Sequence, residues 1–257
     1  MLWLRDMKWF IRAKARVASS IATPFLWLAI IGVGLNSAFS RPGFNYLNFM
    51  APGIVGMTLL FSSTMSGISV IWDKQFGFMK EILVSPVSRI HIMIGKVLGG
   101  MTTAMIQGAL LLVAIGLFKV VGLIDISTPG IVQLLQILVF MILISISFVS
   151  IGLAFASAIK DPIAFPVVIN FLVMPIFFLS GALYPIGKLP GYPQLGTLPG
   201  WLSSIAHLDP LAYGVDGLRD AVLRTSSFPI LFDFGVLAAF SIFMVILGGI
   251  LFRKISF

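Results

Sequence analysis

Apolar residues fill six long stretches of the chain, and polar residues gather in the connections between them. Each stretch reaches the roughly 20 residues that a helix needs to cross a bilayer. None of the six contains Asp, Glu, Lys or Arg. The pattern therefore predicts six transmembrane helices, at residues 21–39, 50–71, 97–118, 130–159, 163–184 and 234–252.

Composition agrees with a membrane protein. Of the 257 residues, 59% are hydrophobic and 10% are charged, whereas a soluble domain has about a quarter charged residues. A single soluble core could not bury that much apolar surface. We therefore expect an all-α membrane protein that forms one domain over residues 1–257. The chain has no cysteine, which excludes disulfides and thiolate metal sites.

Basic residues are distributed unevenly between the connections. Twelve of the 17 Lys and Arg residues fall on the side that both termini share, and five fall on the other side. Because Lys and Arg favour cytoplasmic connections, both termini are expected in the cytoplasm, with the chain spanning the cell (inner, cytoplasmic) membrane. The first apolar stretch is expected to remain as a helix, since no small-x-small cleavage site follows it. The basic residues form no separate soluble module, so no nucleic-acid partner is expected.

The first 18 residues have the pattern of an amphipathic helix. A basic amphipathic helix beside a membrane span typically lies in the headgroup layer. We expect the apolar face to carry Trp3, Leu4, Met7, Phe10 and Ile11, and the basic face to carry Arg5, Lys8, Arg12 and Arg16.

Two further connections are long enough to have structure. Residues 72–96 form the largest cytoplasmic connection and predict a helix, a break before Pro86 and a second helix that enters the third span. Residues 185–229, rich in proline, are expected on the outside, on or dipping into the membrane surface. One helix is predicted there, with Asp209 as N-cap and Pro210 at its first position. The pairs Asp216–Arg219 and Asp220–Arg224 have pair-forming spacings and are expected on its polar surface.

Familiar catalytic and nucleotide-binding motifs are absent from the sequence. No GxxxxGK[ST] phosphate loop and no HExxH motif occurs. His91 and His207 are predicted on opposite membrane faces, so no metal site is expected. Ion-coupled carriers place ionisable residues at membrane depth, and the six apolar stretches contain none. The energy for transport is therefore expected to come from a partner.

Three stretches resemble permeases of type 2 ABC exporters, in the branch with drug-resistance, Nod-factor and polysaccharide export permeases. They are KEILVSPVSRIHIMIGKVLGG (80–100), FFLSGALYPIGKLP (177–190) and HLDPLAYGVDGLRDAVL (207–223). Asp209 stands where this family usually has Asn. Six spans, a basic N-terminal helix and a polar outer loop before the last span are similar to that family along the whole chain.

The resemblance implies a permease subunit of an ATP-driven exporter, not itself an enzyme. Two copies of a separate ABC ATPase subunit would hold ATP and Mg, and the permease would pair with a second copy as a homodimer. The substrate would be an amphiphile such as a drug, a lipid or a lipid-linked glycan, moved out of the cytoplasm or inner leaflet. The implied ATPase-coupling residues are Glu81, Ser85, Pro86, Val87, Ser88 and Arg89. The implied outer gate, built with short re-entrant helices, contains Gly181, Tyr184, Pro185, Asp209, Pro210, Asp216 and Arg219.

Other interpretations stay open at this point. A secondary carrier or channel for small solutes would be favoured by a buried carboxylate that transport requires. A membrane enzyme would need a cluster of catalytic polar groups at one interface. Arg89 and Lys96 could also serve only as headgroup anchors under the positive-inside rule.

Overall fold

The structure, a computed structural model, describes residues 2–40, 44–78, 88–126, 128–159, 161–186 and 198–253, and these ranges are helical with no strand element. An all-α membrane protein is thus confirmed. The helices are α1 (Leu2–Arg12), α2 (Lys14–Leu26), the π-helix η1 (Trp27–Gly32), α3 (Val33–Phe39), α4 (Tyr46–Met65), α5 (Ile68–Gln75), α7 (Arg89–Val120), α8 (Ile131–Ala158), α9 (Ala164–Leu179), α10 (Gly200–Ala206), α11 (Pro210–Leu223) and α12 (Ile230–Arg253).

Five helical segments in the described ranges are long and apolar enough to cross a membrane. The fifth predicted span corresponds to α9, which is apolar but has only 16 residues. At 1.5 Å per residue it is about 24 Å long, short of a hydrocarbon core of about 30 Å. The five longer segments are Val17–Phe39, Tyr46–Gln75, Arg89–Val120, Ile131–Ala158 and Ile230–Arg253.

Three of these segments extend past the predicted stretches and take in ionisable residues. Asp73 lies in α5, Lys96 in α7 and Asp233 in α12, and all three are buried. The expectation that no ionisable residue lies in a span is therefore wrong. Hydropathy ends a span at the first charge, whereas a helix continues wherever its neighbours can shield that charge.

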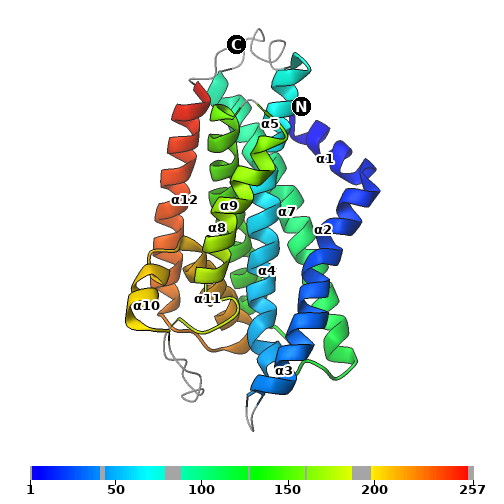
Figure 1. Ribbon diagram of the computed structural model, residues 1–257, viewed down its shortest axis with the longest axis vertical. Coiled ribbons are helices and arrows are strands. Elements are labelled where there is room, and N and C mark those ends of the chain that lie inside the picture. Colours follow the sequence, from blue (N-terminus) through cyan, green and yellow to red (C-terminus); the bar gives the residue numbers. More distant parts are fainter. Residues whose placement is uncertain are drawn as a thin grey trace.

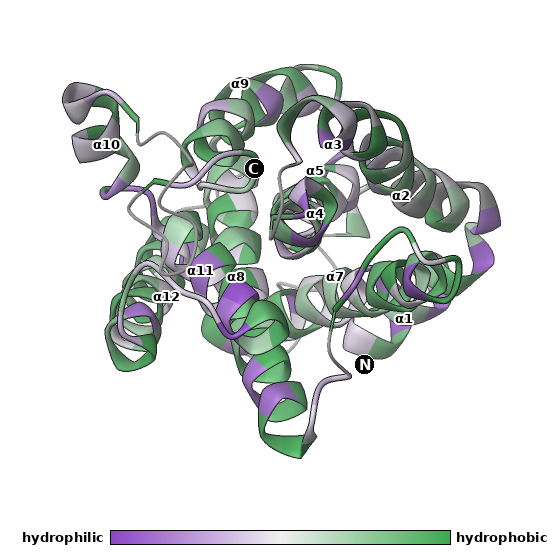
Figure 2. Ribbon diagram, turned by 90° about the horizontal axis from the view of Figure 1, so that it is seen from below, coloured by the Kyte–Doolittle hydropathy of each residue, from purple (hydrophilic) through white to green (hydrophobic). Residues whose placement is uncertain are grey.

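The two most enclosed spans, α4 and α8, occupy the middle of the bundle. The helices α2, α7, α9 and α11 contact α4, and α12 contacts α8. Figures 1 and 2 show the remaining spans arranged around this pair. Side chains on the outer helices are apolar and exposed, as with Val113, Phe171 and Ile242, which suits a surface solvated by lipid tails. The two ends of the chain lie at the same end of the bundle, and α10 and α11 lie at the other (Figure 1).

The N-terminal segment consists of two helices where one was expected over residues 1–18. The helix α1 ends at Arg12, Ala13 interrupts it, and α2 continues into the first span. Pro24 lies within α2, where its ring removes a backbone donor, and the π-helix η1 follows directly. The first span thus has wider turns over Trp27–Gly32 than a regular α-helix has.

A close backbone contact joins the end of α4 to α8. A Cβ atom built on Gly152 would lie 2.2 Å from the carbonyl oxygen of Thr64, and one built on Gly67 would lie 2.4 Å from the carbonyl oxygen of Gly152. Small residues at a crossing let two membrane helices approach to backbone contact. Glycine at 67 and 152 therefore sets the spacing of the two central spans.

Candidate functional site: a cavity beside a buried charge cluster

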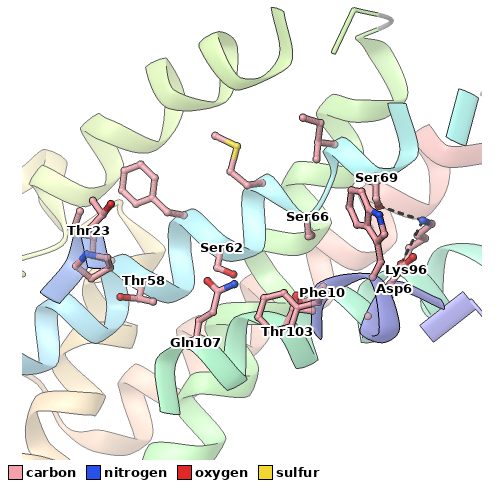
Figure 3. A pocket seen from close by; sticks show the side chains of 18 residues that line it. Asp6, Phe10, Thr23, Thr58, Ser62, Ser66, Ser69, Lys96, Thr103 and Gln107 are labelled. Atoms are coloured by element: carbon pink, nitrogen blue, oxygen red, sulfur yellow. Dashed lines mark hydrogen bonds and ion pairs between the residues drawn. The ribbon is translucent and has the colours of Figure 1, made fainter. Parts of the chain in front are cut away.

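A cavity of about 460 Å³ lies between α1, α2, α4, α5 and α7 (Figure 3). One wall carries a stripe of hydroxyls, Thr58 and Ser62 of α4 and Ser66 directly after it, because residues four apart share one face of a helix. Thr103 and Gln107 of α7 also line it. The apolar lining comes from Phe10, Pro24, Met57, Phe61, Met65 and Ile68.

Most of these polar side chains already have partners within their own helix. The hydroxyls of Thr58, Ser66 and Thr103 donate to carbonyl oxygens of the preceding turn at 2.9, 2.6 and 2.9 Å. Gln107 and Ser62 differ, since neither side chain makes a hydrogen bond with any part of the chain that the structure describes. Gln107 is only 6% exposed. The Gln107 amide lines the cavity and has no partner among the described residues, so it is available to a ligand.

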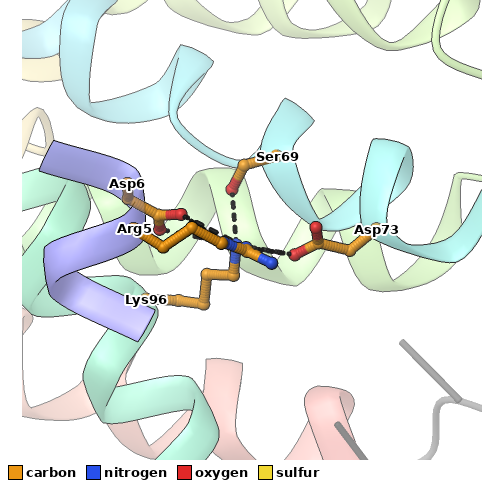
Figure 4. Close-up of polar contacts among 5 residues, drawn as sticks. All are labelled: Arg5, Asp6, Ser69, Asp73 and Lys96. Carbon is orange, nitrogen blue, oxygen red and sulfur yellow. Dashed lines mark hydrogen bonds and ion pairs between the residues drawn. The ribbon is translucent and has the colours of Figure 1, made fainter. Parts of the chain in front are cut away.

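A cluster of four charged residues lies beside the cavity (Figure 4), and two of them, Asp6 and Lys96, line it. The ammonium of Lys96 in α7 lies 2.7 Å from Asp73 in α5 and 3.4 Å from Asp6 in α1. It also donates to the Ser69 hydroxyl at 3.2 Å. The guanidinium of Arg5 lies 2.7 Å from Asp73 and 3.2 Å from Asp6. Two cations thus balance two carboxylates where three helices meet.

This charge cluster was missed by sequence reasoning. The pattern predicts a basic face among headgroups for Arg5 and allows Lys96 to be a headgroup anchor, yet the Lys96 side chain is 1% exposed. One available signal was Asp6, a lone acidic residue in a basic helix. Another was the position of Asp73 and Lys96 just beyond apolar stretches, where a helix can continue and bury a charge that has a partner.

Three predicted outer-gate residues, Gly181, Asp216 and Arg219, lie close together at the end of the bundle opposite the charge cluster. Arg219 donates to the carbonyl oxygen of Gly181 at 2.7 Å, lies 3.5 Å from Asp216, and its guanidinium stands 4.1 Å from the centre of the Phe49 ring. Asp216 also accepts from two backbone N–H groups of residues 227 and 228. Gly181 has φ of +72°, a conformation that favours glycine.

The prediction that Asp216 and Arg219 lie on a polar surface is wrong, because each is only 3% exposed. The helix α11 packs against α4, α8 and α12, which leaves it little free surface. The second predicted pair, Asp220 and Arg224, does not form an ion pair. Asp220 accepts from the Gln136 amide at 2.9 Å, and Arg224 ends the helix with φ of 57°.

The predicted start of α11 is confirmed. The Asp209 carboxylate accepts from the backbone N–H of Leu211 at 2.9 Å, and Pro210 takes the first helical position. Burial raises the pKa of Asp209 to about 8, since a low-polarity environment disfavours the charged form. Tyr184 donates to the carbonyl of Phe178, and Pro185 is buried beside it.

The predicted coupling residues are only partly described. Glu81, Ser85, Pro86 and Val87, and the predicted helix break, lie outside the described residues. Ser88 caps α7, and Arg89 donates to the carbonyl of Arg253 at the end of α12. The second helix of this connection does run into the third span, from Arg89 onward.

Two aromatic side chains are exposed on the connection between α5 and α7. Phe76 is 68% exposed and Phe78 is 51% exposed, just before the segment that carries most of the predicted coupling residues. Ser88 and Arg89, after that segment, are also exposed. Exposed aromatic side chains suit a protein partner.

One buried carboxylate has no partner. Asp233, in the first turn of α12, is 0% exposed, and neither oxygen makes a hydrogen bond within the described part of the chain. The positive end of the helix dipole favours an acidic residue there. In the same ranges no three His, Asp or Glu side chains are grouped to hold a metal ion.

Residues 1–223 match the ABC-2 type transporter family. The chain belongs to this family. It is 29% identical to ycf38 of Cyanophora paradoxa, named a transport permease, over 96% of this chain and 85% of that one. It is 26% identical to the inner membrane transport permease YadH of Escherichia coli K12, over 93% of this chain and 88% of that one. It is 25% identical to nodulation protein J of Rhizobium meliloti, over 98% and 92%.

The family match covers both the cavity and the outer cluster of this ABC-2 permease. Residues 1–223 include the charge cluster, the hydroxyl stripe and all of α11. The resemblance inferred from three short stretches is therefore confirmed along most of the chain.

Proposed function

We propose that this chain is the permease subunit of an ATP-driven exporter that moves an amphiphile out of the cytoplasm or inner leaflet. The family match over 223 residues carries the proposal. Three relatives that align over nearly the whole chain are named transport permeases or a nodulation protein. The chain would lie in the inner membrane with both termini in the cytoplasm.

The energy would come from a separate ABC ATPase. The sequence has no phosphate-binding loop of its own, so ATP and Mg would be held by the partner. Permeases of this family generally work with an ABC ATPase subunit. We propose two ATPase copies on a homodimer of this chain, because a symmetric pair of permeases presents the same docking surface twice.

The ATPase would dock on the connection between α5 and α7. The proposed coupling residues are Glu81, Ser85, Pro86, Val87, Ser88 and Arg89. Exposed Phe76 and Phe78 on one side and Arg89 on the other provide an apolar surface with a charge at its rim, as protein interfaces have. The contact of Arg89 with the end of α12 would pass a movement of the ATPase to the last span.

The outer gate would be the cluster of α11 and the turn after α9. Its proposed members are Gly181, Tyr184, Pro185, Asp209, Pro210, Asp216 and Arg219. The bond from Arg219 to Gly181 joins α11 to the end of α9, so a movement of either element would open or close this end.

The first experiment purifies the tagged chain from its native membrane and identifies the proteins that accompany it. We expect an ABC ATPase, and we expect Arg89→Glu to lower its recovery about tenfold by reversing a charge at the rim. Lys119→Glu is the matched control, because it makes the same change at the far end of α7 and should leave recovery unchanged. A chain that purifies alone and moves solute without nucleotide would contradict the proposal.

A secondary carrier is the competing function, and Asp233 is the observation that favours it. If a proton or ion drove transport, this buried carboxylate would be its binding group. We expect Asp233→Asn to keep the rate of ATP-dependent transport within about twofold of the wild-type rate. Abolished transport with an intact ATPase complex would instead favour the carrier.

A further inference from the structure

We propose that the cavity between α1, α2, α4, α5 and α7 binds the transported amphiphile and selects an uncharged, hydrogen-bonding headgroup. The inference rests on the proposed exporter function and assigns it a binding site and a substrate class. Its basis is the juxtaposition of an apolar cavity, two unpartnered polar side chains and a charge cluster that neutralises itself.

The cavity has the size and lining of a ligand site. Its volume of about 460 Å³ lies within the 300–1,000 Å³ typical of small-molecule pockets. The walls come from five helices, with aromatic and methionine side chains such as Phe10, Phe61 and Met65. Methionine adapts its shape to varied apolar ligands. An alkyl or ring portion of an amphiphile fits this lining.

Two polar side chains are placed to recognise a headgroup. Gln107 and Ser62 face the cavity from α7 and α4 (Figure 3), and neither makes a hydrogen bond within the described residues. An amide offers two donors and one acceptor, and a hydroxyl offers one donor and two lone pairs. Hydroxyl, ether or amide groups of a ligand would satisfy both.

The charge cluster cannot serve a charged headgroup. Lys96 is the one Lys or Arg that lines the cavity among the described residues. Its ammonium has three donors, and Asp73, Asp6 and Ser69 lie within 3.4 Å of it. Arg5 occupies the same two carboxylates from the other side. Since the cluster sums to zero charge, it offers no counter-ion to an anionic or cationic ligand.

The cluster is also distant from the recognition pair. Lys96 and Gln107 lie eleven positions apart on one helix, which is about 16 Å at 1.5 Å per residue. At that distance the headgroup would contact Gln107 and Ser62 without displacing Lys96 from its partners. The structure therefore assigns recognition to neutral groups and leaves the ions to join the helices.

The test uses two photoreactive probes with the same diazirine-bearing alkyl chain. One is a maltoside, which is neutral and rich in hydroxyls, and the other is a carboxylate. Each is added to the purified permease in lipid nanodiscs, illuminated, and the adducts are mapped by mass spectrometry. We expect the maltoside to label Met57–Met65 of α4 about tenfold more than the carboxylate does. Equal labelling by both probes would overturn the selection for neutral headgroups.

Variants then locate the recognition. We expect Gln107→Leu to lower maltoside labelling of α4 about tenfold, and Ser62→Ala, which deletes a single oxygen, to lower it several-fold. Gln133→Leu is the matched control, since Gln133 lies on α8 outside the cavity, and it should leave labelling unchanged. Labelling that neither cavity variant alters would overturn the proposal.

A second readout separates a transported substrate from a resident lipid. In the complex with its ATPase, the maltoside should stimulate ATP hydrolysis by the wild type and fail to stimulate it with Gln107→Leu. If the maltoside labels the cavity selectively but stimulates ATP hydrolysis equally in the wild type and in Gln107→Leu, the cavity is a resident lipid site. That result would overturn the proposal. Failure to recover any ATPase would contradict the exporter function itself, while the labelling pattern would still report on the cavity.

Discussion

Lys96 shows how one residue can hold three helices together. Its ammonium is buried and lies near carboxylates of α1 and α5. Removing one partner of a buried ion pair leaves a charge unbalanced, which typically costs 3–5 kcal/mol. We expect Lys96→Met to destabilise the protein by about 3 kcal/mol, at the low end because Arg5 still faces both carboxylates. Thermal unfolding in detergent measures this loss.

Lys8→Met is the control for that substitution, because Lys8 is exposed on α1 and should change stability by less than about 0.5 kcal/mol. The double variant Lys96→Met with Asp73→Leu should recover part of the loss, since it removes a carboxylate as well as a cation. Equal stability of Lys96→Met and Lys8→Met would show that the cluster contributes nothing.

For single residues, the sequence predicts contacts with near neighbours in the chain better than it predicts burial. The cap at Asp209 and Pro210 was predictable because it depends on neighbours within three residues. The same reasoning placed Asp216 and Arg219 on a surface. Their spacing indicates that they can pair, but only the packing of α11 against three other helices decides that the pair is buried.

Among the elements, the two central spans approach to backbone contact where they cross. We expect Gly152→Ala to destabilise the protein by about 1–3 kcal/mol, because the added methyl would overlap the carbonyl oxygen of Thr64 and force the helices apart. Thermal unfolding together with ATP hydrolysis by the complex would measure the effect on stability and on coupling.

Gly116→Ala provides the comparison on a neighbouring span. Nothing lies within 4 Å of a Cβ atom built on Gly116 in α7, and alanine favours a helix over glycine by up to about 1 kcal/mol. It should therefore leave stability unchanged or raise it slightly. If Gly152→Ala behaved in the same way, the close crossing would have no energetic role.

The existence of the long spans was predictable from their apolar runs, and the positions of their ends were not. Hydropathy identified all five long spans, because a bilayer demands a continuous apolar run. The break at Ala13 has no comparable signal, and Pro24 indicates a disturbed helix near η1 without fixing where the π-helix begins.

For the whole molecule, the orientation in the membrane can be tested directly because the chain has no cysteine. Leu208 at one end is 82% exposed and Phe76 at the other is 68% exposed. We expect a membrane-impermeant maleimide to label Leu208→Cys in intact cells and Phe76→Cys only after the membrane is permeabilised. This pattern follows from the excess of basic residues on the side of Phe76.

The unsubstituted chain, which should not react, is the control for that labelling. The reverse pattern would invert the membrane orientation and place the proposed coupling segment outside the cell, where no ATP-driven partner could dock. Labelling of both variants in intact cells would contradict the predicted number of crossings.

The cavity could not be predicted from the sequence. Its walls come from residues 6 to 107 on five helices, and no periodicity within one helix reveals which faces meet. The hydroxyl stripe of Thr58, Ser62 and Ser66 is visible in the sequence, but hydroxyls in membrane helices more often join helices than bind ligands. Only the arrangement of the spans distinguishes the two roles.

The bond between Trp3 and Thr102 has a consequence for the order of events during synthesis. The Trp3 indole donates to Thr102 at 3.0 Å, 99 residues later in the chain. At 5–20 residues per second, α1 leaves the ribosome about 5 to 20 s before its partner on α7 exists. During that interval its apolar and basic faces suit the headgroup layer. The amphipathic pattern thus suits α1 to the membrane surface before α7 is made, and the ion pairs hold α1 against α5 and α7 in the folded protein.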